Sequence, residues 1–174
     1  SQYEVDQSSM DERIEKIYLE ELKNNVIEAF KGFDIIENSE ISRKKLGKIV
    51  FENKDLKQKL ENIIYPKLKD KILEIFNENK SEKVVFISIP LLFEVGWQDL
   101  FDKILFVQTD DNIRLKRLME RNSYSEKDAK ARISAQIPQE EKIKKSDFII
   151  CNNGTLKILQ NQIERFIIQL EEME

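Results

Sequence analysis

The chain has 174 residues, 40% of them hydrophobic, which is enough to bury one sizeable core, so we expect a single domain over residues 1–174. Lys and Arg total 29 against 33 Asp and Glu, and the net charge of −4 argues against a general nucleic-acid or membrane-surface binder. One cysteine and no histidine exclude an internal disulfide, a structural zinc cluster and a His-based catalytic triad, and they fit a reducing cytoplasm.

The first half of the chain predicts helices. Apolar residues at helical spacing predict one amphipathic helix from Leu19 to Phe30, ending near Gly32, and a second over Ser42–Phe51, capped by Ser42. A long helical pattern follows from Leu56 to Phe76, with Pro66 expected to kink or break it near its middle.

Short apolar runs, rich in β-branched residues, alternate with helical patterns in the second half. The runs cover Val84–Ile89, Ile104–Val107 and Phe148–Cys151, and they are typical of strands buried on both faces of a parallel sheet. The helices are expected over Asn112–Asn122, over Glu126–Gln136 behind the capping box Ser125-x-x-Asp128, and over Thr155–Glu171. The order of elements predicts an α/β fold.

The segment Ile89–Glu94 follows the first predicted strand. Ligands of open α/β sheets bind at the carboxyl ends of strands, so Pro90, Leu91, Leu92, Phe93 and Glu94 are candidates for the wall of a substrate pocket. The alternative is a strand end that packs on the next helix, and for this segment alone that alternative is the stronger one.

Three arginines lie in or beside the next two predicted helices. Arg117 and Arg121 are four residues apart on one helical face, and Arg132 follows on the next helix, so three guanidinium groups could converge on a polyphosphate. The alternative for each arginine is an exposed ion pair with Glu120 or Asp128. The order and spacing of the arginines with Gln136, Pro138 and Lys142 make the set far more specific than its members.

Asn152, Asn153 and Gly154 directly follow the last predicted strand. They could bring backbone amides and an amide side chain to a nucleotide base, or they could form a tight turn that needs Gly or Asn at positive φ. The two interpretations are about equally supported.

From about Leu22 to Gln162 the chain resembles the dephospho-coenzyme A kinases. The resemblance rests on Ile41–Phe51, a helix with Ile64-Tyr65-Pro66, the signature Ile89–Glu94, the two arginine helices, and Ser146–Gly154. The family usually has His where Tyr65 stands and often an acidic residue at the position of Ser88. The resemblance implies a P-loop kinase-like parallel sheet flanked by helices, with a helical acceptor-side region over about 20–80 and a helical lid over about 112–145.

The resemblance also implies an activity, the transfer of the ATP γ-phosphate to the ribose 3′-hydroxyl of dephospho-coenzyme A. Asp6, in Glu4-Val5-Asp6, is similar to the family's general base, and Mg²⁺ is expected with ATP, although no protein ligand for the metal is identified. Arg132, Arg117, Arg121 and Gln136 would meet ATP from the lid, and Asn153 and Gly154 would lie beside the adenine. A cytoplasmic enzyme is expected, with no nucleic-acid or membrane partner.

The phosphate-binding motif G-x-x-x-x-G-K-[ST] does not occur in the 174 residues, whose four glycines are too far apart to form it. We expect that the first strand and the phosphate loop lie upstream of Ser1 and that the 174 residues alone transfer no phosphate at a useful rate. Two alternatives remain, a non-catalytic binding relative that has lost this loop and a different small-molecule kinase of the same fold.

Overall fold

The computed structural model describes residues 22–173, and the chain divides into two compact units, Ser1–Ser88 and Ile89–Glu174. The expectation of a single domain therefore stays a prediction. Asp6 and the first residues of the predicted Leu19–Phe30 helix lie outside the described residues. No helix among the described residues is long and apolar enough to cross a membrane.

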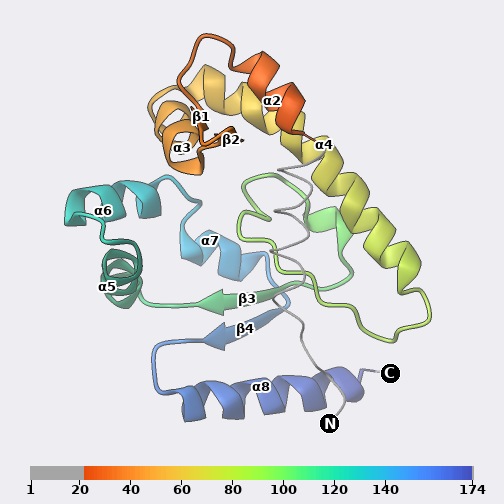
Figure 1. Cartoon of the computed structure of the whole chain (residues 1–174). Helices are drawn as coiled ribbons and strands as arrows, with labels where there is room; N and C mark the ends of the chain where they lie inside the picture. Colours follow the sequence, from red (N-terminus) through yellow and green to blue (C-terminus); the bar gives the residue numbers. More distant parts are fainter. Residues whose placement is uncertain (1–21, 174) are drawn as a thin grey trace. The chain divides into compact units, whose positions relative to one another are not determined.

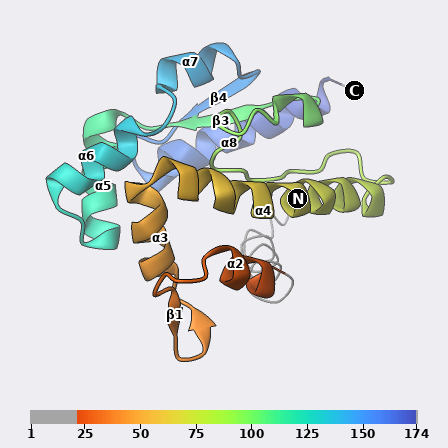
Figure 2. The ribbon, with the colours of Figure 1, turned by 90° about the horizontal axis from the view of Figure 1, so that it is seen from above.

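In its described part, from residue 22 on, the first unit contains three helices and a short hairpin (Figure 1). In chain order these are α2 (Lys23–Ala29), β1 (Ile36–Glu37), β2 (Glu40–Ile41), α3 (Arg43–Glu52) and α4 (Lys54–Glu78). Figure 2 shows α3 leading from the hairpin to the start of α4. One apolar cluster unites these elements, with contributions from each helix and from both sides of the hairpin: Leu22, Val26, Phe30, Ile35, Ile41, Leu46, Leu60 and Ile64.

Two expectations for this unit, a break at Pro66 and a cap by the Ser42 hydroxyl, are not met. Pro66 lies inside α4, which continues without a break because buried residues on both sides of it, such as Ile64 and Ile72, hold both halves in place; a kink there stays a prediction. Ser42 occupies the N-cap position of α3, but its hydroxyl makes no capping bond and instead donates to Glu37 Oε2 over 2.8 Å.

The second unit is built on two parallel strands, β3 (Leu105–Gln108) and β4 (Phe148–Cys151), paired in register from Leu105 with Phe148 to Gln108 with Cys151. The 3₁₀ turn η2 (Gln98–Leu100) precedes β3, and the helices α5 (Asp111–Asn122), α6 (Glu126–Ser134) and α7 (Gln139–Lys144) connect the strands. A parallel pair requires such a crossover, so the predicted α/β arrangement is confirmed for this part of the chain.

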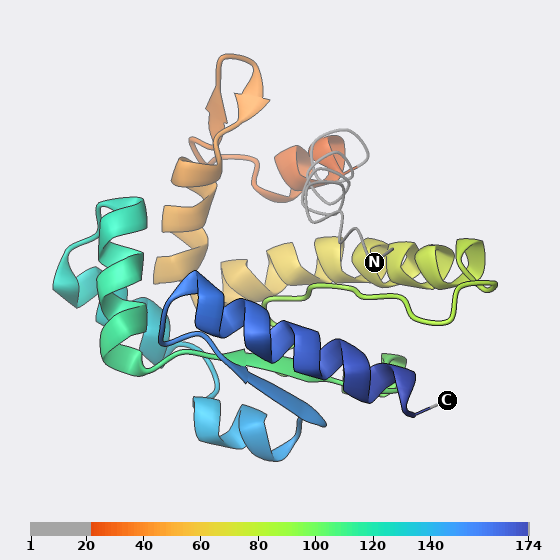
Figure 3. The same cartoon turned by 90° about the horizontal axis from the view of Figure 1, so that it is seen from below.

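The last helix, α8 (Leu156–Glu171), packs along β4, and α7 contacts β3 (Figure 3). The Phe166 ring of α8 meets Phe148 edge-on at 5.1 Å between centroids. The side-chain amide of Gln162 also bonds both backbone groups of Cys151, at 2.9 and 2.8 Å. It thereby satisfies peptide groups that a further strand would otherwise pair.

The first predicted strand, Val84–Ile89, is not formed, and this expectation is corrected. The segment is extended chain without a ladder, since the described residues form only the sheets β1–β2 and β3–β4. Its apolar composition is that of a strand, yet a strand exists only where a neighbouring chain accepts and donates its hydrogen bonds.

Candidate functional site

The loops that follow β3 and β4 are joined at the carboxyl edge of the sheet. Asp110 comes directly before α5, and its N–H donates to Asn153 Oδ1 over 2.8 Å, while Asn153 Nδ2 donates to Asp110 Oδ1 over 2.8 Å. Both strands point towards this edge and towards α5 (Figure 1). This edge is where α/β sheets bind ligands.

A second side-chain amide fastens the start of α5. Gln139, the first residue of α7, accepts from the Thr109 N–H at 3.2 Å and donates to the Thr109 carbonyl at 2.8 Å and to Asp111 Oδ1 at 2.9 Å. Thr109 is thus held by both of its peptide groups, and the direction of α5 is set by side chains from elsewhere in the unit.

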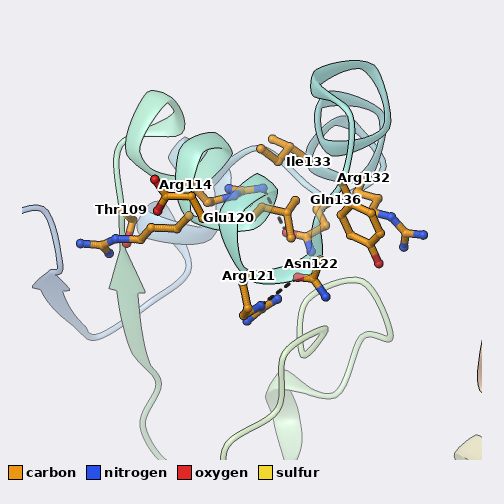
Figure 4. A pocket seen from close by; sticks show the side chains of 11 residues that line it. Thr109, Arg114, Glu120, Arg121, Asn122, Arg132, Ile133 and Gln136 are labelled. Carbon is orange, nitrogen blue, oxygen red and sulfur yellow. Dashed lines mark hydrogen bonds between the residues drawn. The ribbon is translucent and has the colours of Figure 1, made fainter.

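A cavity of about 890 Å³ opens between α5 and α6 beside this edge (Figure 4). Four arginines contribute to its wall: Arg114, Arg117, Arg121 and Arg132. Glu120 is the one carboxylate in the lining, and it lies 3.9 Å from Lys116, so the wall is strongly basic. A basic concave wall with planar guanidinium groups is suited to a polyphosphate.

Two of these arginines are tied to the frame of the site. Arg114 Nη2 donates to Gln136 Oε1 at 3.2 Å and Nη1 lies 3.5 Å from Asp111 Oδ1, so this arginine bridges the start of α5 and the segment after α6. Arg117 Nη1 donates to the carbonyl of Asn152 at 2.9 Å, which links α5 to the loop after β4.

The other two arginines have local contacts. Arg121 Nε donates to Asn122 Oδ1 at 2.9 Å. The Arg132 guanidinium lies 4.4 Å above the centre of the Tyr124 ring, a cation–π contact that orients the group.

The structure therefore brings Arg117, Arg121, Arg132 and Gln136 together in one cavity. Their sequence positions favoured this arrangement, and their roles towards ATP stay predictions. Arg114 and Tyr124 were missed. Arg114 could have been found from spacing alone, because it precedes Arg117 by one helical turn and lies on the same stripe of α5 as Arg121.

The Pro90–Glu94 segment does not contribute to the lining of this cavity. Phe93 is buried at 8% exposure, whereas Leu91 is exposed at 36%, and the chain here forms turns closed by bonds such as Trp97 N–H to the Leu92 carbonyl at 3.1 Å. Pro90 is exposed and Leu92 half-buried. Leu91 and Pro90 are thus the members best placed to meet a ligand.

Glu94 has a different environment from its neighbours. Its Oε1 accepts from Lys142 Nζ at 2.6 Å and from the Ile137 N–H at 3.0 Å. Burial alone raises the pKa of Glu94, but hydrogen bonds from Lys142 and the backbone and the charge of Lys142 outweigh it and hold this pKa below its ordinary value. Ionised Glu94 therefore contributes fully to stability at pH values above the pKa that it has in the unfolded chain. This contribution is lost as the pH falls through the lower pKa that Glu94 has in the folded protein.

Asn153 and Gly154 do not line the arginine cavity either. The Asn153 amide is engaged with Asp110, and a Cβ on the exposed Gly154 would lie 3.0 Å from Ile158 Cδ1. None of Asn152, Asn153 and Gly154 has a positive φ, so the expected tight turn with Gly or Asn at positive φ is wrong, while the nucleotide contact stays a prediction.

Asn153→Ala is expected to lower the free energy of unfolding by about 1–2 kcal/mol, because two hydrogen bonds between the strand loops are lost. Asn152→Ala is the matched control, since the bonds of Asn152 described above use its carbonyl, and its stability should stay close to wild type. Urea titration of both variants, with ATP affinity measured in parallel, separates a structural role of the Asn153–Asp110 bonds from a nucleotide contact. Unchanged stability with weakened ATP binding would contradict the structural role.

An α/β fold with an arginine-lined cavity at the carboxyl edge of parallel strands defines a class of polyphosphate-binding proteins. Comparison with known proteins narrows this class. Residues 5–157 match the dephospho-CoA kinase family.

Individual relatives agree with this match. A dephospho-CoA kinase from Listeria innocua is 46% identical over 145 residues, which are 81% of this chain and 72% of the relative, and one from Geobacillus kaustophilus is 40% identical over 157 residues, 89% of this chain and 78% of the relative. The solved dephospho-CoA kinase from Campylobacter jejuni is 35% identical with a TM-score of 0.62, covering 92% of this chain and 85% of that one. The chain therefore belongs to the dephospho-CoA kinase family.

Proposed function

We propose that this protein, as its full gene product, transfers the γ-phosphate of ATP to the ribose 3′-hydroxyl of dephospho-coenzyme A. Family membership over residues 5–157 supports the reaction. The observation that carries the proposal at the level of the site is the cavity between α5 and α6, whose wall holds four arginines.

The arginines suit phosphoryl transfer because this reaction depends on positioning and on neutralising charge rather than on covalent chemistry. Arg132, oriented by Tyr124, is proposed to face the transferring phosphoryl group, with Arg117 and Arg121 on the remaining phosphates. Gln136 accepts from Arg114, and we assign it to holding the lid arginines in register as well as to meeting ATP.

Asp6 is proposed as the general base, although it lies outside the described residues. In the step, the ribose 3′-oxygen bonds to the γ-phosphorus, the bond from that phosphorus to the β,γ-bridging oxygen breaks to release ADP, and the hydroxyl proton passes to the Asp6 carboxylate. Asn153 and Gly154 remain candidates for the adenine side, and Pro90–Phe93 for the acceptor side. Glu94 is withdrawn as a substrate contact, since its oxygen Oε1 bonds Lys142 and Ile137.

ATP use follows from the family, and Mg²⁺ with it stays a proposal. The described residues contain no group of three or more His, Cys, Asp or Glu placed to hold a metal ion, so they do not fit a protein-built Mg²⁺ site. No step is derived through the metal. A cytoplasmic location is likewise proposed from the family alone.

Acceptor choice tests this proposal against another small-molecule kinase. ADP release by the full-length gene product should depend on dephospho-coenzyme A and should stay at the background rate with adenosine or pantetheine as acceptor. Faster ADP release with either alternative acceptor would contradict the proposed substrate. ATP binding without ADP release for any acceptor would instead favour the non-catalytic relative.

A further inference from the structure

The carboxylate of Glu94 is buried where three segments of the second unit meet. The side chains of Glu94 and Lys142 are 17% and 7% exposed, and their charged atoms are 2.6 Å apart. Oε1 also accepts from the Ile137 N–H at 3.0 Å, and Oε2 is buried with no hydrogen-bond partner among the described residues. The pair thus joins the turn after Ile89, the segment after α6, and α7.

Stability alone is a weak reason for such a pair. Removing two charges from water costs much of what their attraction returns, and well-packed apolar residues often replace a buried ion pair without loss. Apolar residues could not, however, accept the Ile137 N–H. This acceptor is the part of the pair that apolar packing cannot supply.

The Ile137 bond lies next to the arginine cavity. Ile137 directly follows Gln136, whose Oε1 accepts from Arg114 and which lines the cavity. Fixing the peptide of Ile137 therefore fixes where the Gln136 side chain starts, and through Gln136 it limits the position of the Arg114 guanidinium.

The helix α7 links the segment after α6, where Ile137 lies, to the start of α5. Lys142 and Gln139 lie three residues apart on α7 and so on one helical face. Lys142 bonds Glu94, while Gln139 holds both peptide groups of Thr109 and the carboxylate of Asp111. The same short helix fastens the chain where it enters α5 and where it leaves α6.

We propose that Glu94 is a positioning residue, which sets the arginine lid for ATP by accepting the Ile137 N–H while Lys142 compensates its charge. The inference rests on the proposed function, because ATP is taken as the ligand of the cavity. Glu94 touches no reacting atom. Its effect is exerted through Ile137 and Gln136 on the geometry of the arginines.

Two double variants of the full-length gene product separate positioning from folding. Glu94→Gln/Lys142→Met removes both charges but keeps an oxygen that can accept the Ile137 N–H, whereas Glu94→Leu/Lys142→Met removes both charges and the acceptor. The Leu/Met variant should have an ATP KM about tenfold above that of the Gln/Met variant, as expected for one lost hydrogen bond to a partly buried donor. The KM for dephospho-coenzyme A should differ by less than twofold between them.

A structural role alone predicts the opposite order. The Leu/Met variant has the more apolar replacement and should resist urea at least as well as the Gln/Met variant. If the ATP KM depended only on stability, the Leu/Met variant would therefore have the lower ATP KM of the two. The matched control is Glu126→Gln/Lys130→Met on α6, whose charged atoms are also 2.6 Å apart but whose side chains are 60% and 62% exposed. This control should keep the wild-type ATP KM.

Equal ATP KM values for the two Glu94 variants, or a lower value for Leu/Met, would overturn the inference. ATP dissociation constants from calorimetry keep this test separate from the fate of the proposed function. If wild type binds ATP but makes no coenzyme A, the proposed function fails, and the ratio of ATP dissociation constants between the two variants still decides the positioning role. Absence of ATP binding by wild type would overturn both.

Discussion

Arg132→Ala is expected to lower the turnover of ATP with dephospho-coenzyme A by about 100-fold or more, the low side of what an arginine contributes to phosphoryl transfer. The guanidinium lines the cavity and is oriented by the Tyr124 ring at 4.4 Å. Charge that grows on the phosphoryl group in the transition state would lose its counterpart. The KM for dephospho-coenzyme A should change little, because Arg132 is assigned to the phosphate side.

Steady-state kinetics of the full-length gene product would measure this effect. Arg132→Lys should restore only part of the rate, since a point ammonium does not reproduce the planar fork of donors. Arg165→Ala on α8 is the control, because Arg165 lies away from the arginine cavity and should leave the rate unchanged. Equal rates for wild type, Arg132→Ala and Arg132→Lys would show that Arg132 only solvates α6.

Lys142→Met should lower the free energy of unfolding by about 3–5 kcal/mol, the usual effect of removing one partner of a buried ion pair. The methionine fills the apolar stem of the lysine but leaves Glu94 buried and uncompensated. Burial then raises the pKa of Glu94, whereas in wild type the Lys142 partner and the hydrogen bonds hold it down.

This shift gives the prediction a pH signature. At pH values above the ordinary pKa range of carboxyl groups, the ionised Glu94 contributes fully to the free energy of unfolding of wild type. The difference in this free energy between wild type and Lys142→Met is therefore largest at these pH values. As the pH falls, Glu94 is protonated in the variant first and the difference narrows. Urea titrations from neutral to acidic pH would show this, with the exposed Lys130→Met as a control of near-zero effect. A difference that is constant with pH would contradict the ion-pair account.

Three helices of the second unit, α5, α6 and α8, could be predicted closely because their caps and periodicity are local, whereas the short helix α7 was missed. Ser125 accepts the Asp128 N–H at 3.2 Å, as the capping box predicts, and Thr155 caps the start of α8. The hairpin β1–β2 was missed, because its turn places Asn38 and Ser39 at positive φ and serine is a poor signal for such a turn. Val84–Ile89 failed as a strand because pairing is not a local property.

The site was predictable to a similar extent. Residues that share a helical face, such as Arg117 and Arg121, follow from spacing, and Arg114 belongs to the same pattern. Glu94 could not be assigned from the sequence, because its partners Lys142 and Ile137 are brought to it only by the crossover between β3 and β4. Side-chain amides that bond distant backbone groups, as Gln139 does, likewise produce no repeating pattern in the sequence from which they could be predicted.

Formation of coenzyme A from ATP and dephospho-coenzyme A by the full-length gene product tests the central claim most directly. Chromatography with mass detection should show one added phosphate on dephospho-coenzyme A, with ADP in equal amount, and ³¹P spectra should place that phosphate on the ribose 3′-oxygen. Binding of ATP without any phosphorylated product, or phosphate on another position, would contradict the account.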